Sequence, residues 1–178
     1  MIKSNIIAEN ELKKIYPFAT ISNVRLYLPF LNKYFSHYQI NTPLRVCAFL
    51  AQVGHESGQL RYAEEIASGA AYEGRKDLGN VHPGDGRKYK GRGLIQVTGR
   101  FNYDAISKSL GIDFLNFPEK LKEPEFAVLS AFWFWDKNCL NVYADREDFK
   151  GLTKKINGGY NGLKDREALY KKALEVLL

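Results

Sequence analysis

Apolar residues recur at helical spacing through most of this chain of 178 residues. Positions three and four residues apart share one face of a helix, so the pattern predicts a series of amphipathic helices. The predicted helices cover residues 4–15, 23–37, 43–56, 102–110, 124–136, 146–156 and 164–178. Ser22 is the expected N-cap of the second helix, and Pro29 inside it predicts a kink or a later start.

The third predicted helix differs from the others because apolar side chains surround its axis. Thr42 followed by Pro43 is typical of a helix N-terminus, and the run from Leu44 to Val53 is apolar on most sides. A helix of this kind is buried on most sides. We therefore expect it to be the central helix of the fold.

Residues 58–100 lack a helical pattern and are rich in glycine. Ten of the 15 glycines lie between Gly54 and Gly99. A connection this long inside a compact domain is usually functional. The sequence thus predicts a mainly α-helical single domain over residues 1–178, with a glycine-rich irregular lobe and at most a short β-hairpin near residues 87–97.

The net charge is +6, from 26 lysines and arginines against 20 acidic residues. A basic balance favours polyanionic partners such as nucleic acid, cell-wall polymer or a membrane surface, although a solvated basic surface is equally compatible with it.

Cys47 and Cys139 are expected to be buried free thiols. No apolar stretch has the length of a signal peptide or of a membrane span. We expect synthesis in the cytoplasm, a monomer, and no stable membrane insertion.

Glu56 stands where the predicted central helix ends. The partial negative charge of a helix C-terminus and an apolar surround both favour the protonated carboxyl, which a general acid requires. Glu65 follows nine residues later, and in one continuous helix the two side chains would point to opposite faces. Gly58 predicts a break that allows the two carboxyls to converge. Glu64 and Glu65 are alternatively solvated charges, and Glu73 is a rival second acid.

Other chemistries are less well supported by the sequence. His37, His55 and His82 are too scattered for a metal-ligand pattern, so no metal is expected. Ser57 has no base pattern near it. The stretch from Gly84 to Arg100 lacks the spacing of a phosphate-binding loop and any nucleic-acid-binding signature, and no nucleic acid is expected as a partner. A tight glycine turn that places polar groups against a ligand fits this stretch better.

Five motifs taken in order resemble glycoside hydrolase family 19, which contains chitinases and many phage endolysins. They are HES at 55–57, the glutamate at 65, KYKGRGLIQVTGRFNY at 88–103, AFWFW at 131–135 and INGG at 156–159. The resemblance implies a lysozyme-like, two-lobed fold with a cleft between the lobes. It also implies an inverting mechanism that needs no cofactor.

The resemblance assigns roles to individual residues. It implies that Glu56 is the general acid, Glu65 the general base, and Thr98 the residue that helps to hold the nucleophilic water. The positions that it implies contact the substrate are His55, Tyr89, Gln96, Asn102, Tyr103 and Asn157.

The region around residues 70–93 is more similar to phage endolysins and their prophage relatives than to plant chitinases. This similarity implies that the substrate is the glycan strand of bacterial peptidoglycan. The enzyme is then expected in the host cytoplasm until a holin-like partner releases it to the periplasm and cell wall. A chitinase and a catalytically silent glycan-binding module are the alternatives.

Overall fold

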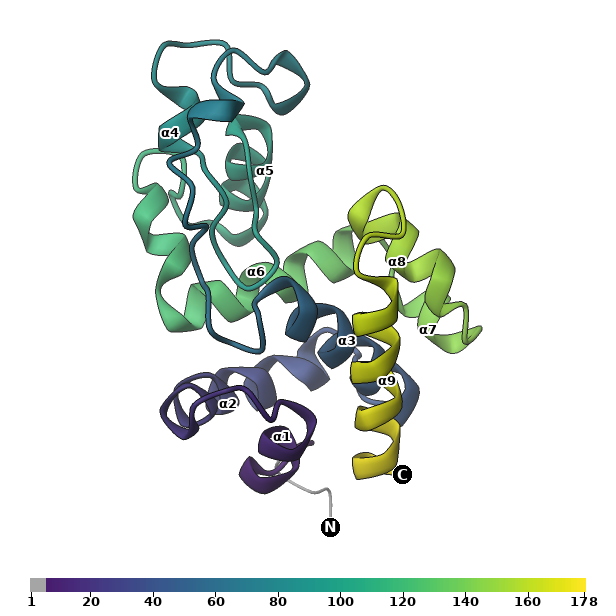
Figure 1. Ribbon diagram of the computed structural model, residues 1–178. Helices are drawn as coiled ribbons and strands as arrows, with labels where there is room; N and C mark the ends of the chain where they lie inside the picture. The colour runs from purple at the N-terminus through teal and green to yellow at the C-terminus, as the bar shows by residue number, and fades with distance from the viewer. Residues whose placement is uncertain (1–5) are drawn as a thin grey trace. The chain divides into compact units, whose positions relative to one another are not determined.

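The computed structural model describes residues 6–178, and Figure 1 colours the chain from purple at the N-terminus to yellow at the C-terminus. The chain divides into two compact units. One comprises the residues up to Arg61 together with Phe132–Leu178, and we call it the helical unit. The other, Tyr62–Ala131, we call the loop-rich unit.

The helical unit contains α1 (Glu9–Ile15), α2 (Ile21–His37), α3 (Pro43–Glu56), α7 (Asn141–Asp145), α8 (Phe149–Asn157) and α9 (Leu163–Leu177). The loop-rich unit contains α4 (Asp85–Lys88), α5 (Arg100–Leu110) and the short 3-10 helices Ala70–Tyr72, Lys76–Leu78 and Pro118–Lys122. Helix α6 (Pro124–Lys137) begins in the loop-rich unit and ends in the helical one.

Helix α3 is the centre of the helical unit, as predicted. The Thr42 side chain accepts a hydrogen bond from the Arg45 amide at 3.3 Å, and Pro43 opens the first turn. Every residue from Val46 to Gly54 is buried. Helix α9 packs along α3, and the two helices lie side by side in Figure 1. This packing brings the C-terminal segment of the chain to the helix that carries Glu56.

The N-terminal helices begin at different residues from those predicted. Residues 4 and 5 of the first predicted helix lie outside the described residues, and α1 starts only at Glu9. The N-cap of α2 is Thr20 and not Ser22, because the Thr20 hydroxyl accepts the Asn23 amide at 3.1 Å. Helix α2 then runs through Pro29, so the predicted later start is wrong.

The remaining helices lie close to their predicted ranges. Helix α5 ends at Gly111 in a left-handed conformation, which glycine adopts without steric cost. Helix α8 begins later than predicted, because Asp148 caps it by accepting the Gly151 amide at 2.8 Å. The short helix α7 was not predicted from the sequence.

The loop-rich unit holds its backbone together with short-range turns. Arg92 and Val97 exchange two backbone hydrogen bonds of 3.1 and 2.8 Å and so close a tight turn where the hairpin was expected. Arg92 also forms an isolated bridge with Glu64, and no longer strand occurs in residues 6–178. The expectation of a mainly α-helical fold with at most a short hairpin is confirmed. No helix in the described part of the chain is long and apolar enough to cross a membrane.

Candidate active site

Glu56 is the last residue of α3, and its carboxylate is paired with an arginine. Arg166, on α9, donates from Nη2 to Glu56 Oε1 at 2.5 Å. The Glu56 side chain is 21% exposed, whereas that of Arg166 is 1% exposed. The pair therefore presents the carboxylate at the surface of the helical unit and keeps the guanidinium inside it.

Arg166 is held in turn by a buried polar chain. Its Nη1 donates to Gln52 Oε1 at 2.5 Å, and Gln52 Nε2 donates to Thr153 Oγ1 at 2.9 Å. Gln52 and Thr153 are completely buried. These hydrogen bonds join α9, α3 and α8, so side chains from three helices fix the orientation of the Arg166 guanidinium.

The expected apolar surround of Glu56 is wrong. The Arg166 guanidinium contacts the carboxylate, so the surroundings of Glu56 at the end of α3 are polar and not apolar. Sequence reasoning missed Arg166 because this residue lies 110 positions from Glu56. One signal was available: Arg166 falls on the buried stripe of α9 with Leu169 and Ala173, where a charged residue requires a partner.

The predicted break after Glu56 is present and involves more than Gly58. Helix α3 ends at Glu56, and Gly58, Gln59 and Leu60 all have positive φ, at 57°, 59° and 65°. Side chains fix this left-handed turn, since Ser57 Oγ accepts the Leu60 amide at 2.9 Å and Gln59 Oε1 accepts the Phe18 amide at 2.9 Å. Non-glycine residues in this conformation are rare and cluster at functional sites.

His55, predicted to bind substrate, lies beside Glu56 in the sequence and contacts α9. Its Nδ1 lies 2.6 Å from Asp165 Oδ2. Its ring packs so closely on Gly162 that a Cβ there would lie 2.2 Å from His55 Cε1. The imidazole lines a surface cavity of about 360 Å³ in the helical unit, together with Phe18, Gly54, Gly58, Gln59, Arg61 and Asp165.

Glu65 lies in the loop-rich unit, and its two carboxylate oxygens have different surroundings. Oε2 accepts hydrogen bonds from the Tyr72 hydroxyl at 3.0 Å and the Gly91 amide at 3.1 Å. Oε1 is buried and has no protein hydrogen-bond partner. Burial and the contact with Glu65 raise the pKa of Tyr72, so the phenol stays protonated and donates a hydrogen bond to the carboxylate. One oxygen is thus oriented by the protein, and the other is buried without a protein partner.

Gln96 and Thr98 lie next to this carboxylate around Gly91. A Cβ added to Gly91 would lie 2.7 Å from Glu65 Oε2, 2.7 Å from Gln96 Oε1 and 3.3 Å from Thr98 Oγ1. Three predicted site residues therefore converge on one glycine that has no room for a side chain. Thr98 Oγ1 donates to the Gln96 carbonyl at 3.0 Å, which orients its hydroxyl.

Glu73, the rival second acid, binds backbone amides with its carboxylate. Its two carboxylate oxygens accept the Gly84 amide at 2.6 Å and the Gly86 amide at 2.8 Å. A carboxylate that holds two amides with both oxygens joins two parts of a loop and is a poor candidate for proton transfer. These contacts favour Glu65 over Glu73 as the predicted second carboxylate.

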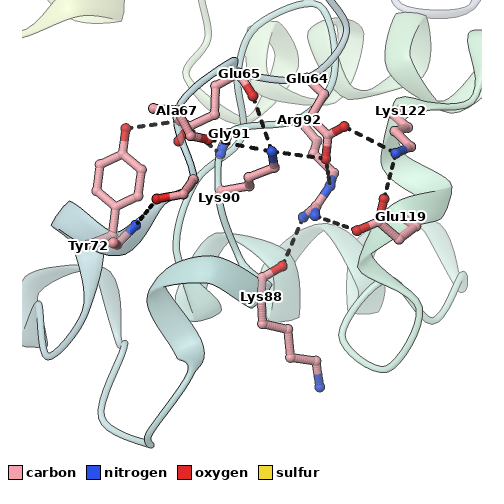
Figure 2. Close-up of polar contacts among 12 residues, drawn as sticks. Glu64, Glu65, Ala67, Tyr72, Lys88, Lys90, Gly91, Arg92, Glu119 and Lys122 are labelled. Atoms are coloured by element: carbon pink, nitrogen blue, oxygen red, sulfur yellow. Dashed lines mark hydrogen bonds and ion pairs between the residues drawn. The ribbon is translucent and has the colours of Figure 1, made fainter.

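Glu64, expected to be a surface charge, belongs to an ion-pair cluster (Figure 2). Its oxygens contact Arg92 Nε at 3.0 Å, Lys122 Nζ at 3.1 Å and Lys90 Nζ at 3.4 Å. Partial burial alone raises the pKa of Glu64, but the Lys122 hydrogen bond and the charges of Arg92, Lys122 and Lys90 outweigh it and lower the pKa. Glu64 is thus partly exposed but not a freely solvated charge, because it is paired with cations from residues distant in the sequence.

Tyr89 and Tyr103, both predicted substrate contacts, are completely buried. Their rings pack together at a centroid distance of 5.2 Å. The Tyr89 hydroxyl donates to the Leu115 carbonyl at 3.0 Å, and that of Tyr103 to the Lys90 carbonyl at 2.7 Å. The structure therefore argues against direct contact with a ligand, and we assign both residues to the support of the glycine-rich loops.

The two predicted asparagines differ in their contacts. Asn102 Nδ2 donates to the Thr98 carbonyl at 2.9 Å, so this side chain braces the segment that carries Thr98. Asn157 lies at the end of α8 in the helical unit, and its Nδ2 is buried without a protein partner. Such an unsatisfied donor is unusual in a folded protein and marks Asn157 as a candidate for ligand contact.

The comparisons with known proteins place the chain in a family. The family model described as chitinase class I, of glycoside hydrolase family 19, matches residues 38–144. A glycosyl hydrolase family 19 domain-containing protein of Haemophilus influenzae is 34% identical over 155 residues, covering 69% of this chain and 75% of its relative. The chain belongs to glycoside hydrolase family 19.

Plant chitinases are among its other relatives, and bacterial and plant chitinases are among the solved structures that share its fold. An endochitinase of Arabidopsis thaliana is 41% identical over 115 residues, which is 64% of this chain but only 39% of that protein. The chain thus spans about two fifths of the length of such plant relatives. The structure matches chitinase C of Streptomyces griseus with a TM-score of 0.78 at 24% identity, over 97% of this chain and 76% of the other. It matches a class IV chitinase of Zea mays with a TM-score of 0.75 at 22% identity, over 97% and 92% of the chains. These structural matches support the predicted fold.

Proposed function

We propose that this protein is a muralytic glycosidase of the endolysin kind, which hydrolyses β-1,4 bonds in the glycan strands of bacterial peptidoglycan. Family membership supports glycoside hydrolysis. The observation that carries the catalytic assignment is the Glu65 carboxylate, with one oxygen oriented by Tyr72 and Gly91 and the other without a protein partner. The basic balance of the chain, +6, supports a polyanionic wall polymer as the target.

In the proposed mechanism Glu56 protonates the glycosidic oxygen as the bond to the anomeric carbon breaks. Glu65 accepts a proton from a water molecule through Oε1, and the oxygen of that water bonds to the anomeric carbon from the opposite face. The product therefore has the inverted configuration. Thr98 helps to orient the water. Arg166 donates to the Glu56 carboxylate and so fixes the direction in which this side chain points.

The first experiment measures glycosidase activity of Glu56→Gln and Glu65→Gln on purified peptidoglycan. Both variants keep the shape of the side chain but cannot transfer the proton, so we expect losses of about 10²–10⁴-fold each. Glu175→Gln, on the exposed surface of α9, is the matched control and should keep full activity. Lysis that survives in Glu65→Gln but is lost in Glu73→Gln would reassign the base to Glu73.

A chitinase is the second candidate, favoured by the names of the plant and bacterial relatives. The wild type should release products from peptidoglycan far faster than from chitin oligomers of matched length. Activity on chitin alone would overturn the endolysin proposal and leave the catalytic pair intact. Binding of both glycans without turnover would instead indicate a catalytically silent binding module.

The stereochemistry and the linkage can be read from the products. Proton NMR of product taken early in the reaction should show the α anomer, and an initial β anomer would mean a retaining route and a different role for Glu65. Mass spectrometry of the new reducing ends would show whether N-acetylmuramic acid or N-acetylglucosamine is released there. This measurement identifies which of the two alternating linkages is cut.

A further inference from the structure

Arg92 is a buried cation at the centre of the loop-rich unit. Its side chain is 3% exposed and donates hydrogen bonds in several directions. The acceptors are the Lys88 carbonyl at 2.8 Å, Tyr103 Oη at 3.0 Å, Glu64 Oε1 at 3.0 Å and Glu119 Oε1 at 2.6 Å. Figure 2 shows the guanidinium between Glu64 and Glu119. A planar fork that serves four acceptors in fixed directions is a property of arginine that lysine lacks.

The backbone of Arg92 links the two segments that form the Glu65 half of the site. On one side it forms the bridge with Glu64, next to which the Glu65 amide donates to the Gly91 carbonyl at 2.9 Å. On the other side it exchanges two hydrogen bonds with Val97, between Gln96 and Thr98. The position of Arg92 therefore sets the register between Glu65 and the segment that carries Thr98.

The Glu65 carboxylate depends on this register directly. Gly91, the residue before Arg92, donates its amide to Glu65 Oε2 at 3.1 Å. Lys90 donates from Nζ to the Glu65 carbonyl at 3.2 Å, and its own carbonyl accepts the Tyr103 hydroxyl that Arg92 contacts. A shift of the guanidinium is thus transmitted to both the main chain and the carboxylate of Glu65.

We propose that Arg92 is a positioning residue for the general base, which holds Glu65 in the orientation needed to take a proton from water. The proposal rests on the proposed function of Glu65. Misplacement by about 1 Å can cost about 10²-fold in rate, so a positioning role has a measurable consequence. A merely structural role would lower stability without a specific effect on turnover.

Arg100 provides a matched control in the same unit. It forms an equally close fork on Asp85, with Nε to Oδ2 at 2.9 Å and Nη2 to Oδ1 at 2.5 Å. Neither Arg100 nor Asp85 has a hydrogen bond to Glu65, Gly91 or Thr98 among the contacts of the described residues. Loss of this pair should destabilise the unit without moving the base.

The test compares Arg92→Lys, Arg92→Met and Arg100→Met by kcat, KM and thermal midpoint, on peptidoglycan fragments at a temperature where all variants are folded. We expect kcat to fall about 10- to 100-fold in both Arg92 variants while KM changes less than about 2-fold. Arg100→Met should lower the thermal midpoint as Arg92→Met does but keep kcat within about 2-fold. Equal effects of the Arg92 and Arg100 variants on kcat would overturn the proposal, as would an effect of Arg92→Met on KM alone.

A double-mutant cycle with Glu65→Asp separates the two proposals. The shorter side chain already displaces the carboxylate, so Arg92→Met should reduce kcat much less in this background than in the wild type. If the fold-losses in kcat of the two single variants instead multiply in the double variant, Arg92 acts independently of Glu65. The positioning role would then be rejected. If Glu65→Gln retains activity, the proposed function of Glu65 fails first, whatever the Arg92 variants do.

Discussion

The two units hold their candidate carboxylates by different physical means. In the helical unit Glu56 ends a regular helix whose buried faces pack against α9, and one buried arginine meets it there. In the loop-rich unit Glu65 lies in irregular backbone, and hydrogen bonds from Tyr72, Gly91 and Lys90 hold it. Apolar packing places a helix as a rigid body, whereas a loop requires a separate polar contact for each direction of movement.

The largest effect is expected when the buried partner of Glu56 is removed. Arg166→Met leaves Glu56 and Gln52 without the cation that pairs with them, which should cost about 3–5 kcal/mol in the free energy of unfolding. Denaturant unfolding measures it. Arg25→Met, which breaks the exposed pair with Glu9, is the control and should change stability little. Similar losses in both variants would mean that burial of Arg166 is not the decisive factor.

Glycine substitutions test the comparison at one position in each unit. A Cβ on Gly54 in α3 would lie 2.5 Å from Tyr16 Cε1 in the core, so Gly54→Ala should lower stability by about 1–3 kcal/mol through overpacking. A Cβ on Gly91 would meet Glu65 Oε2 and Gln96 Oε1 instead, at 2.7 Å each. Gly91→Ala should therefore reduce kcat by about 10-fold or more with a smaller loss of stability.

Kinetics and thermal unfolding of the same two preparations check this pair of predictions. We expect Gly54→Ala to lose more stability than Gly91→Ala, and Gly91→Ala to lose more kcat than Gly54→Ala. If Gly91→Ala is destabilised as strongly as Gly54→Ala and keeps its kcat, Gly91 is a packing glycine and its closeness to Glu65 has no catalytic meaning.

Acid should weaken the loop-rich unit through Asp85. The Arg100 hydrogen bonds outweigh the effect of burial and hold the pKa of Asp85 below its ordinary value of 3.8. A lowered folded pKa means that the stabilisation is complete above the unfolded pKa and is lost as the pH falls through the folded one. The free-energy difference between wild type and Asp85→Asn should therefore be largest above about pH 5 and shrink towards pH 2. A difference independent of pH would contradict this assignment.

The smallest effect concerns the two cysteines, which the sequence predicted to be buried alike. Cys47 is buried in α3, and burial raises the pKa of its thiol to about 11. Cys139 is exposed, so the expectation is wrong for this residue. A thiol reagent at neutral pH should modify Cys139 rapidly and Cys47 only after unfolding, with Cys139→Ser as the control. Rapid modification of Cys47 in the native protein would show that α3 opens readily.

Local signals predicted the helices well where propensity and packing agree. Thr42 and Pro43 marked the start of α3, and Gly111 marked the end of α5. They are ambiguous in α2, where the apolar side chain of Leu26 is 43% exposed. The buried stripe of α2 is Val24, Tyr27, Leu31 and Phe35. Several apolar stripes were possible on this helix, and only packing against the rest of the unit selects one.

The sequence by itself determined the helical framework, the break after Glu56 and the motifs that identify the family, because caps, turns and apolar periodicity act over a few residues. Tertiary structure decided which charges meet. Arg166 reaches Glu56 from 110 positions away, and Arg92 gathers Glu64 and Glu119 across 28 and 27 positions. It also turned Glu73 towards two backbone amides and buried Tyr89 and Tyr103. Ion pairing depends on distance in space, and no local pattern in the chain encodes that distance.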